Sequence, residues 1–154
     1  MNDYQKSKLA TLCAREHVAA IVTIGEDWPT VTMQAFAETS ELDLIFIMPA
    51  DSDKFQNLSR RPNAAILIDD RDTGDVRKLA VSRASIQGIA NEVAQNSPQW
   101  DRLKAIFLDK NPFEAPFFAP KYVGRLRMVR IRPSRVSYAG PVGGPPEDTF
   151  KVEL

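Results

Sequence analysis

Short apolar segments separated by a few polar residues recur along this sequence, and they constrain its fold more than any other feature. The first three cover residues 18–24 (VAAIVTI), 30–37 (TVTMQAFA) and 43–48 (DLIFIM). β-branched and aromatic residues favour strands, and the turn between the first two segments contains Gly25 and Asp27. Turns this short join neighbouring strands in antiparallel order, whereas a parallel sheet would need a helix between most strands. The sequence therefore predicts an antiparallel β-structure.

The second half of the chain supplies three longer apolar segments. These further predicted strands cover residues 63–70, 79–93 and 123–133. The fifth strand is expected to bend or bulge at Gly88. In the sixth, Leu126 and Met128 lie on one face, whereas Val129 and Ile131 lie on the other. This change of phase predicts a bulge, or a strand that passes from one sheet to another.

Helical patterns accompany these strands. They cover residues 3–16, about 52–60, and 97–110. The last pattern is the clearest, because Ser97 suits the N-cap position and Pro98 suits the first helical position. The proline-rich residues 111–120 predict an irregular apolar connection.

Together these elements predict a mainly β fold, a six- to seven-stranded antiparallel barrel with two or three peripheral helices. The barrel domain is expected over residues 1–140. Residues 138–148 (YAGPVGGPPED) are rich in glycine and proline. We therefore expect residues 141–154 to form an exposed, poorly ordered C-terminal tail.

The composition narrows the range of functions. Lys plus Arg equals Asp plus Glu at 20 each, so no net field attracts the chain to nucleic acid or to an acidic membrane. The single cysteine, Cys13, and the single histidine, His17, exclude a disulfide framework and a histidine-rich metal site. Cys13 is expected in the core rather than as a nucleophile. No segment has the pattern of a signal peptide or a membrane span, which predicts a cytoplasmic protein.

The segment MPADSDKFQNL (48–58) is the first candidate binding site. It follows the third predicted strand and begins a helix at Ser52. A helix N-terminus presents free N–H groups to an anion, and Ser52 and Lys54 add a hydroxyl and a cation. The alternative is an ordinary capped helix, which Asp51 and Asp53 favour because acidic residues already complement the helix dipole.

The second predicted strand is the next candidate. If Val31, Met33 and Ala35 face the barrel interior, Gln34 lies on the opposite face, where its amide can hydrogen-bond a planar heterocycle. The alternative is an ordinary half-buried amphipathic strand. On the fifth strand, Gln87 lies four positions after Arg83 and shares its face. This pair fits a ligand with a phosphate and a ring carbonyl, or a solvated strand face.

Four segments, in this order, resemble the pyridoxamine-5′-phosphate-oxidase-like, FMN-binding split-barrel proteins. They are residues 18–37, 43–70, 81–93 and 122–140, the last of which resembles the subgroup related to heme-utilisation proteins. The resemblance implies a homodimer with two FMN molecules at the subunit interface. The cofactor-binding residues that it implies are Met33, Gln34 and Ala35 on the second strand, Ser52, Asp53, Lys54 and Asn57 in the phosphate loop, and Gln87 on the fifth strand.

Differences from the family pattern limit the implied activity. The second strand carries no basic residue, and the sequence ends in EDTFKVEL without the Trp and His of the true oxidases. A vitamin B6 oxidase is therefore not expected, and the histidine-bearing C-terminal region of the heme-degrading relatives is absent too. We expect an FMN-dependent oxidoreductase that acts on a small molecule. The alternatives are a non-enzymatic sensor that binds flavin, heme or another planar ligand, and a structural dimer with a vestigial site.

Overall fold

The computed structural model describes residues 1–154, apart from the side chain of Lys78. Its strands are β1 (Val18–Ile24), β2 (Pro29–Glu38), β3 (Leu44–Pro49), β4 (Asn63–Asp69), β5 (Arg83–Val93), β6 (Leu126–Ala139) and β7 (Thr149–Glu153). Its α-helices are α1 (Asp3–Arg15), α2 (Asp53–Arg60), α3 (Pro98–Lys110) and α4 (Pro120–Val123). Short 3₁₀ helices are η1 (Val76–Lys78), η2 (Pro112–Phe118) and η3 (Pro146–Asp148).

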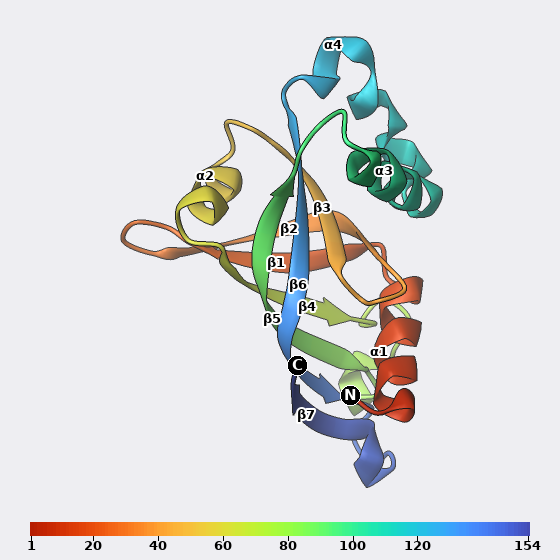
Figure 1. The fold of residues 1–154 in the computed structure, drawn as a ribbon. Coiled ribbons are helices and arrows are strands. Elements are labelled where there is room, and N and C mark those ends of the chain that lie inside the picture. Colours follow the sequence, from red (N-terminus) through yellow and green to blue (C-terminus); the bar gives the residue numbers. More distant parts are fainter.

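Strands β1 to β6 close into an antiparallel barrel (Figure 1). The hydrogen-bonded order is β3–β2–β1–β4–β5–β6, and an additional pairing between β3 and β6 closes it. β2 pairs with β1 from Pro29 to Ala35, but with β3 only from Phe36 to Glu38. The predicted mainly β barrel is therefore confirmed, and its wall opens between β2 and β3 just before Phe36.

Strand β6 extends beyond the barrel, and two different strands pair with different parts of its length on the same edge. Residues 126–131 pair with β3, and residues 135–139 pair with β7. Opposite β5 the register shifts between Gln87 and Gly88, so that Ser134 of β6 is an extra residue. A Cβ atom at Gly88 would lie 2.5 Å from the carbonyl oxygen of Arg132, so this close approach requires glycine. The predicted bulge at Gly88 is thus confirmed.

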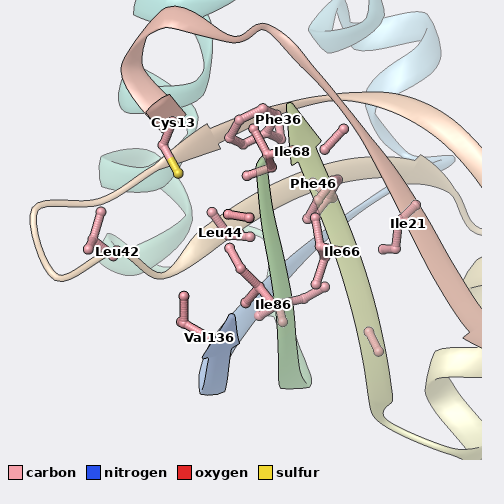
Figure 2. Packing of buried hydrophobic residues seen from close by; sticks show 14 of the residues in the cluster. Cys13, Ile21, Phe36, Leu42, Leu44, Phe46, Ile66, Ile68, Ile86 and Val136 are labelled. Carbon is pink, nitrogen blue, oxygen red and sulfur yellow. The ribbon is translucent and has the colours of Figure 1, made fainter. Parts of the chain in front are cut away.

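The main core fills the barrel and continues under α1 (Figure 2). Its largest fully buried side chains include Phe36, Phe46, Ile66 and Ile86. Leu9 and Leu12 of α1 pack on the same cluster, as the amphipathic pattern of residues 3–16 predicts. Cys13 also lies there, fully buried, and burial raises the pKa of its thiol to about 12. Its predicted place in the core is confirmed.

A second core lies outside the barrel, beneath α3. Trp100, Leu103 and Phe107 of α3 pack there with residues of β2, β3 and β6. Leu126 and Met128 belong to this second core, whereas Val129 and Ile131 belong to the main core. The change of phase predicted within the sixth strand therefore gives one strand a face on each core.

The rest of the outer barrel wall exposes apolar side chains, and we call this surface the open face. Opposite partners in neighbouring strands share a face, so the registers place Val31 beside Val22 and Met33 beside Ala20. Val31 is 65% exposed and Met33 74% exposed. The open face is made of Val18, Ala20, Val22, Ile24, Val31, Met33, Ala65 and Leu67.

Three expectations need correction. The fifth strand begins at Arg83 rather than at residue 79, because residues 80–82 are not in the ladder and Leu79 adopts a left-handed φ of 53°. The proline-rich residues 111–120 are largely helical turns, not an irregular connection. Residues 149–153 are not a disordered tail, since they pair with β6 as β7.

The start of the C-terminal segment is also fixed, by its contact with α1. The hydroxyl of Tyr4 donates to a carboxylate oxygen of Asp148 at 2.5 Å, and the Lys8 ammonium lies 2.8 Å from the same carboxylate. The amide of Gly140 donates to the Asp148 carbonyl oxygen at 2.7 Å. These bonds hold η3 and the start of β7 against the N-terminal helix.

Candidate functional site

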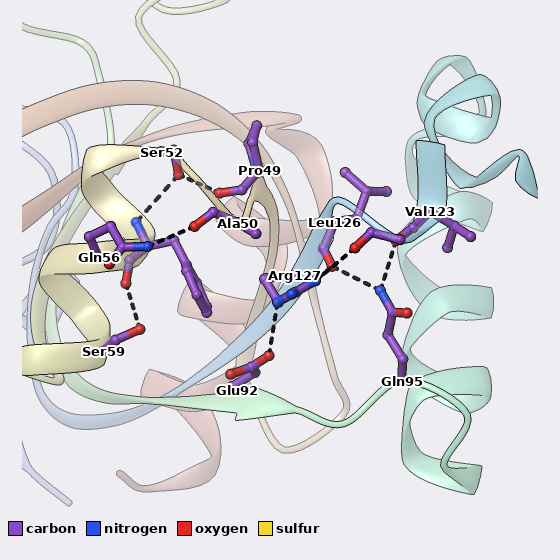
Figure 3. Close-up of polar contacts among 12 residues, drawn as sticks. Pro49, Ala50, Ser52, Gln56, Ser59, Glu92, Gln95, Val123, Leu126 and Arg127 are labelled. Carbon is purple, nitrogen blue, oxygen red and sulfur yellow. Dashed lines mark hydrogen bonds and ion pairs between the residues drawn. The ribbon is translucent and has the colours of Figure 1, made fainter. Parts of the chain in front are cut away.

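The loop between β3 and α2 is braced by its own hydrogen bonds (Figure 3). The Ser52 hydroxyl donates to the Pro49 carbonyl oxygen at 2.7 Å and accepts from the Phe55 amide at 3.4 Å. The Gln56 side chain donates to the Ala50 carbonyl oxygen at 2.9 Å. Ser52 is therefore an N-cap whose hydroxyl hydrogen is already used inside the loop. Its predicted role as a phosphate donor stays a prediction.

Lys54 lies in the first turn of α2 and differs from an ordinary surface lysine. Its side chain is half-buried, and the described side chains offer it no carboxylate partner. Burial lowers its pKa below the usual 10.5 because the ammonium loses contact with water. The neighbouring Asp53 is exposed and forms no ion pair with it. A desolvated cation beside a helix N-terminus is suited to an anionic group.

Asn57 fastens α2 to the hairpin of β1 and β2. Its side-chain nitrogen donates to the hydroxyl of Thr23 at 3.1 Å and to that of Thr30 at 3.3 Å. Because Lys54 precedes Asn57 by three residues, both lie on the same side of the helix. Asn57 thus has a positioning contact within the chain, and its predicted role in closing the turn stays a prediction.

Gln34 lies where β2 separates from β3. Its side-chain nitrogen donates to the Ile47 carbonyl oxygen, two residues before the end of β3. Its other polar atom, Oε1, is buried and has no hydrogen-bond partner. An unpaired buried acceptor is costly, so this oxygen would gain from a ligand that carries an N–H donor.

The neighbours of Gln34 lie on the outer side of β2. Ala35 is buried under α3, whereas Met33 projects from the open face. The assumption that Val31 and Met33 face the barrel interior is wrong, because Phe36 occupies that side instead. Alternation alone could not decide this, since both sides of β2 carry apolar residues.

Gln87 lies on the same outer surface, but further round the barrel. It is exposed on β5 opposite Ala65, and it shares its face with Arg83 as predicted. It lines a pocket of about 250 Å³ together with Val22 and Ile24. Three strand spacings, about 14 Å, separate it from β2. The structure therefore places α2 beside β2 through the bond from Asn57 to Thr30, and Gln34 beside Ile47 of β3, but it leaves Gln87 three strands away from β2.

A second pocket on this surface was not found by sequence reasoning. It has a volume of about 200 Å³ and is lined by Met33 and Leu67 of the open face and by Glu16, Asp69 and Asp72. Glu16 comes from the end of α1, Asp69 from the last position of β4 and Asp72 from the loop that follows, more than 50 positions away. No spacing in the sequence indicates that these groups meet.

Other chemistries find less support among the described residues. No group of three His, Cys, Asp or Glu side chains there is placed to hold a metal ion. His17 is exposed at the start of β1 and lines a pocket with Glu38 and Lys110. Among the described residues, no helix is long and apolar enough to cross a bilayer.

Comparison with solved structures shows the same fold in several proteins. A heme-binding protein from Mycobacterium smegmatis superposes with a TM-score of 0.82 at 16% identity, over 96% of this chain and 57% of the other. The heme storage protein HutZ from Vibrio cholerae gives 0.68 at 16% identity, over 82% and 88%. A putative pyridoxamine 5′-phosphate oxidase from Listeria innocua gives 0.68 at 14% identity, over 87% and 97%. This chain thus spans little more than half of the M. smegmatis protein.

Sequence comparison places the chain in a family. No curated protein matches it significantly. The family model described as pyridoxamine 5′-phosphate oxidase matches residues 6–140, which include the barrel strands β1 to β6 and the α2 loop. This agrees with the resemblance of the four segments. The chain belongs to the pyridoxamine 5′-phosphate oxidase family.

Proposed function

We propose that this protein is a homodimeric FMN-binding flavoprotein of the cytoplasm that oxidises or reduces a small molecule. The observation that carries the proposal is Lys54, a half-buried cation without a carboxylate partner among the described side chains. It lies beside a helix N-terminus and close to a strand that presents an unpaired acceptor. The first two features suit the phosphate of FMN, and the third suits its ring.

The phosphate of FMN fits the N-terminus of α2. The Lys54 ammonium would neutralise its charge, and the free N–H groups of the first turn would donate to its oxygens. Ser52 and Gln56 hold the loop in this shape before any ligand arrives. Asp53 is exposed and reduces the local positive charge, so the site relies on Lys54.

The flavin ring fits the edge of β2. The ring carries an N–H group that could donate the hydrogen bond that the buried Oε1 of Gln34 lacks. Met33 and Ala35 would contact the ring through their backbone groups. These residues, with Ser52, Asp53, Lys54 and Asn57, are the ones that this chain would use to hold the cofactor. Bound FMN supplies hydride or electron transfer, while the protein supplies position and electrostatics.

Dimer formation is part of the proposal because the open face is apolar and exposed. Large exposed apolar surfaces on small domains mark interaction sites, and a second copy would cover this one. Gln87 lies on the same outer surface about 14 Å from β2, so we propose that it serves the cofactor bound by the partner. Two cofactors would then lie at one two-fold interface.

A second candidate is a sensor that binds heme or another planar ligand on the same surface. The observation in its favour is the similarity of fold to the M. smegmatis heme-binding protein and to HutZ. The identities of 16% show a shared fold and no more. Heme would leave Lys54 without the single phosphate that fits it, which is why we prefer FMN.

Spectroscopy on the purified protein tests the proposal. We expect flavin absorption bands, or quenching of flavin fluorescence when FMN is added, with one FMN bound per chain. Oxidation of NADH or NADPH by the loaded protein would then measure turnover. An intense Soret band on adding hemin, together with no response to FMN, would favour the sensor instead.

A substitution on the open face tests whether this surface forms the proposed dimer. Val31→Glu places a charge on the proposed interface and is expected to give a monomer by light scattering after gel filtration. Val142→Glu is the matched control, because Val142 is equally exposed at 63% but lies in the loop before η3. A native protein that is itself monomeric in this measurement would contradict the proposed dimer.

A further inference from the structure

Glu16 is the most unusual carboxylate of this protein. It is the C-cap residue of α1, and only 6% of its surface is exposed. Its side chain forms no hydrogen bond or ion pair with any described residue, although it lines the 200 Å³ pocket beside Met33. The partial negative charge at a helix C-terminus opposes an anion, so Glu16 is disfavoured by both burial and position.

The nearby arginines form no ion pair with Glu16, because other carboxylates already hold them. Arg71 donates two hydrogen bonds to the carboxylate of Asp69. Arg15 lies 3.6 Å from Asp70 and donates to the hydroxyl of Thr73 at 2.9 Å. Arg71 is therefore paired with Asp69, and Arg15 with Asp70.

Two carboxylates at the pocket remain without a cation. Glu16 and Asp72 both line it, and neither has a hydrogen bond or ion pair among the described residues. With Asp69 and Arg71 cancelling each other, the lining carries two net negative charges when all its carboxylates are ionised. The opposite wall is apolar and includes Met33 and Leu67. The pocket thus combines an anionic rim with an apolar wall.

From this combination we infer that the pocket binds an organic cation, a protonated amine or guanidinium carried on an apolar group. The charged end would pair with Glu16 and Asp72, and the apolar end would cover Met33 and Leu67. A bare metal ion fits less well, because the described carboxylates do not converge as a three-ligand group. An amine is satisfied by two separated acceptors and gains from the apolar wall.

The inference goes beyond the proposed function and does not require the cofactor. Met33 borders the pocket and is also a predicted flavin contact. A cation bound here would therefore lie beside the flavin ring, if FMN binds as proposed, and amine-bearing substrates would be the class to test first. The residues that line the pocket all come from one chain, and Met33 and Leu67 also belong to the open face, so binding can be measured on flavin-free protein both as purified and as the Val31→Glu variant.

Calorimetric titration of the flavin-free protein with benzylamine tests the site, with benzyl alcohol as the neutral probe of similar shape. We expect benzylamine to bind and to raise the melting temperature, and benzyl alcohol to do neither. Glu16→Gln keeps the shape but removes the charge, and should weaken benzylamine binding by about tenfold or more. Asp101→Asn removes an exposed charge on α3 and should leave the affinity unchanged.

Any of three results would overturn the inference. Equal binding of the amine and the alcohol, or unchanged affinity in Glu16→Gln, would show that the carboxylate does not recognise a cation. If benzylamine does not bind and Glu16→Gln instead weakens the dimer, the pocket accepts a basic side chain of a second copy and not a ligand. Failure of FMN to bind leaves these measurements unaffected, so the two proposals fail separately.

Discussion

The side-chain amide of Asn57 donates a hydrogen bond to the Thr23 hydroxyl at 3.1 Å, and this contact joins helix α2 to the first strand of the barrel. Thr23 is almost fully buried, and its hydroxyl also lies 2.8 Å from that of Thr30. The three side chains form a small polar cluster at the opening of the barrel. The position of Lys54, one turn earlier in α2, depends on this cluster.

Removing the amide should therefore affect both stability and binding. Asn57→Ala is expected to lower the free energy of unfolding by about 1–3 kcal/mol, since it leaves the Thr23 and Thr30 pair without a donor. It should also weaken FMN binding, because α2 is no longer held. Urea denaturation measures the first effect. Asn91→Ala, at an exposed position of β5, is the control and should change neither.

The burial of Glu16 predicts how stability depends on pH. Burial, with Asp72 as the next cause, raises the pKa of this carboxyl above 4.5, and Asp69 and Asp70 act in the same direction while Arg15 opposes them. Arg71 also borders the pocket. A raised folded-state pKa means that the folded protein binds the proton more tightly than the unfolded chain, so this group costs stability as the pH rises through its folded pKa.

Glu16→Gln removes that cost. We expect the variant to melt at a higher temperature than the native protein at pH 7, with the difference disappearing near pH 4. Melting curves by circular dichroism across this range measure it. A native protein that is more stable than the variant at pH 7 would show that Glu16 already has a favourable partner.

The ion pair of Lys110 and Glu38 should be important for the attachment of α3. The Lys110 ammonium lies 2.5 Å from the Glu38 carboxylate and 4.0 Å from the centre of the Phe36 ring, and it donates to the Cys13 carbonyl oxygen at 2.6 Å. Both side chains are mostly buried. Lys110→Met leaves a buried carboxylate unpaired and is expected to cost about 2–4 kcal/mol.

A double variant isolates the charge effect in this ion pair. Adding Glu38→Gln to Lys110→Met should recover part of the lost stability, because it removes the unpaired charge. Thermal denaturation of the native protein, the two single variants and the double variant gives the coupling free energy between the two side chains. Strictly additive effects would mean that the two side chains do not interact in solution.

Asp148 should stabilise the C-terminal segment in a pH-dependent manner. Hydrogen bonds from Lys8 and Tyr4 lower the pKa of its carboxyl below 3.8. A lowered folded-state pKa gives stability that is present above pH 3.8 and is lost as the pH falls through the folded pKa. Asp148→Asn should therefore lower the melting temperature at pH 7 and expose the amides of β7 to faster hydrogen exchange. Unchanged exchange in β7 would contradict this role.

Much of the fold could be predicted because local signals agree with tertiary structure. β1 spans the predicted residues 18–24, where β-branched residues, turn residues and alternation all agree. β7 could not be predicted, because its pairing with β6 and the bonds of Asp148 are long-range contacts that follow a Gly/Pro-rich stretch. Such contacts override local propensity.

The candidate site likewise combines features that local sequence determines with features that long-range contacts determine. The N-cap at Ser52 follows from local sequence, and the structure has it. Which side of β2 faces outward depends on α3 and on the position of Phe36, so the assumption that Met33 faces the barrel interior is wrong. Gln34 was a candidate from the sequence, but its unpaired buried oxygen is a feature that no sequence pattern shows.

The central claim is that Lys54 and the N-terminus of α2 bind the phosphate of FMN. The most direct test compares the affinities of FMN and riboflavin, which differ only in that phosphate, for the native protein and for Lys54→Met. Lys6→Met, at an exposed position of α1, is the matched control. We predict that native protein and control prefer FMN by about tenfold to a hundredfold, and that Lys54→Met loses most of this preference while its affinity for riboflavin is unchanged. An undiminished preference for FMN in folded Lys54→Met would contradict the account.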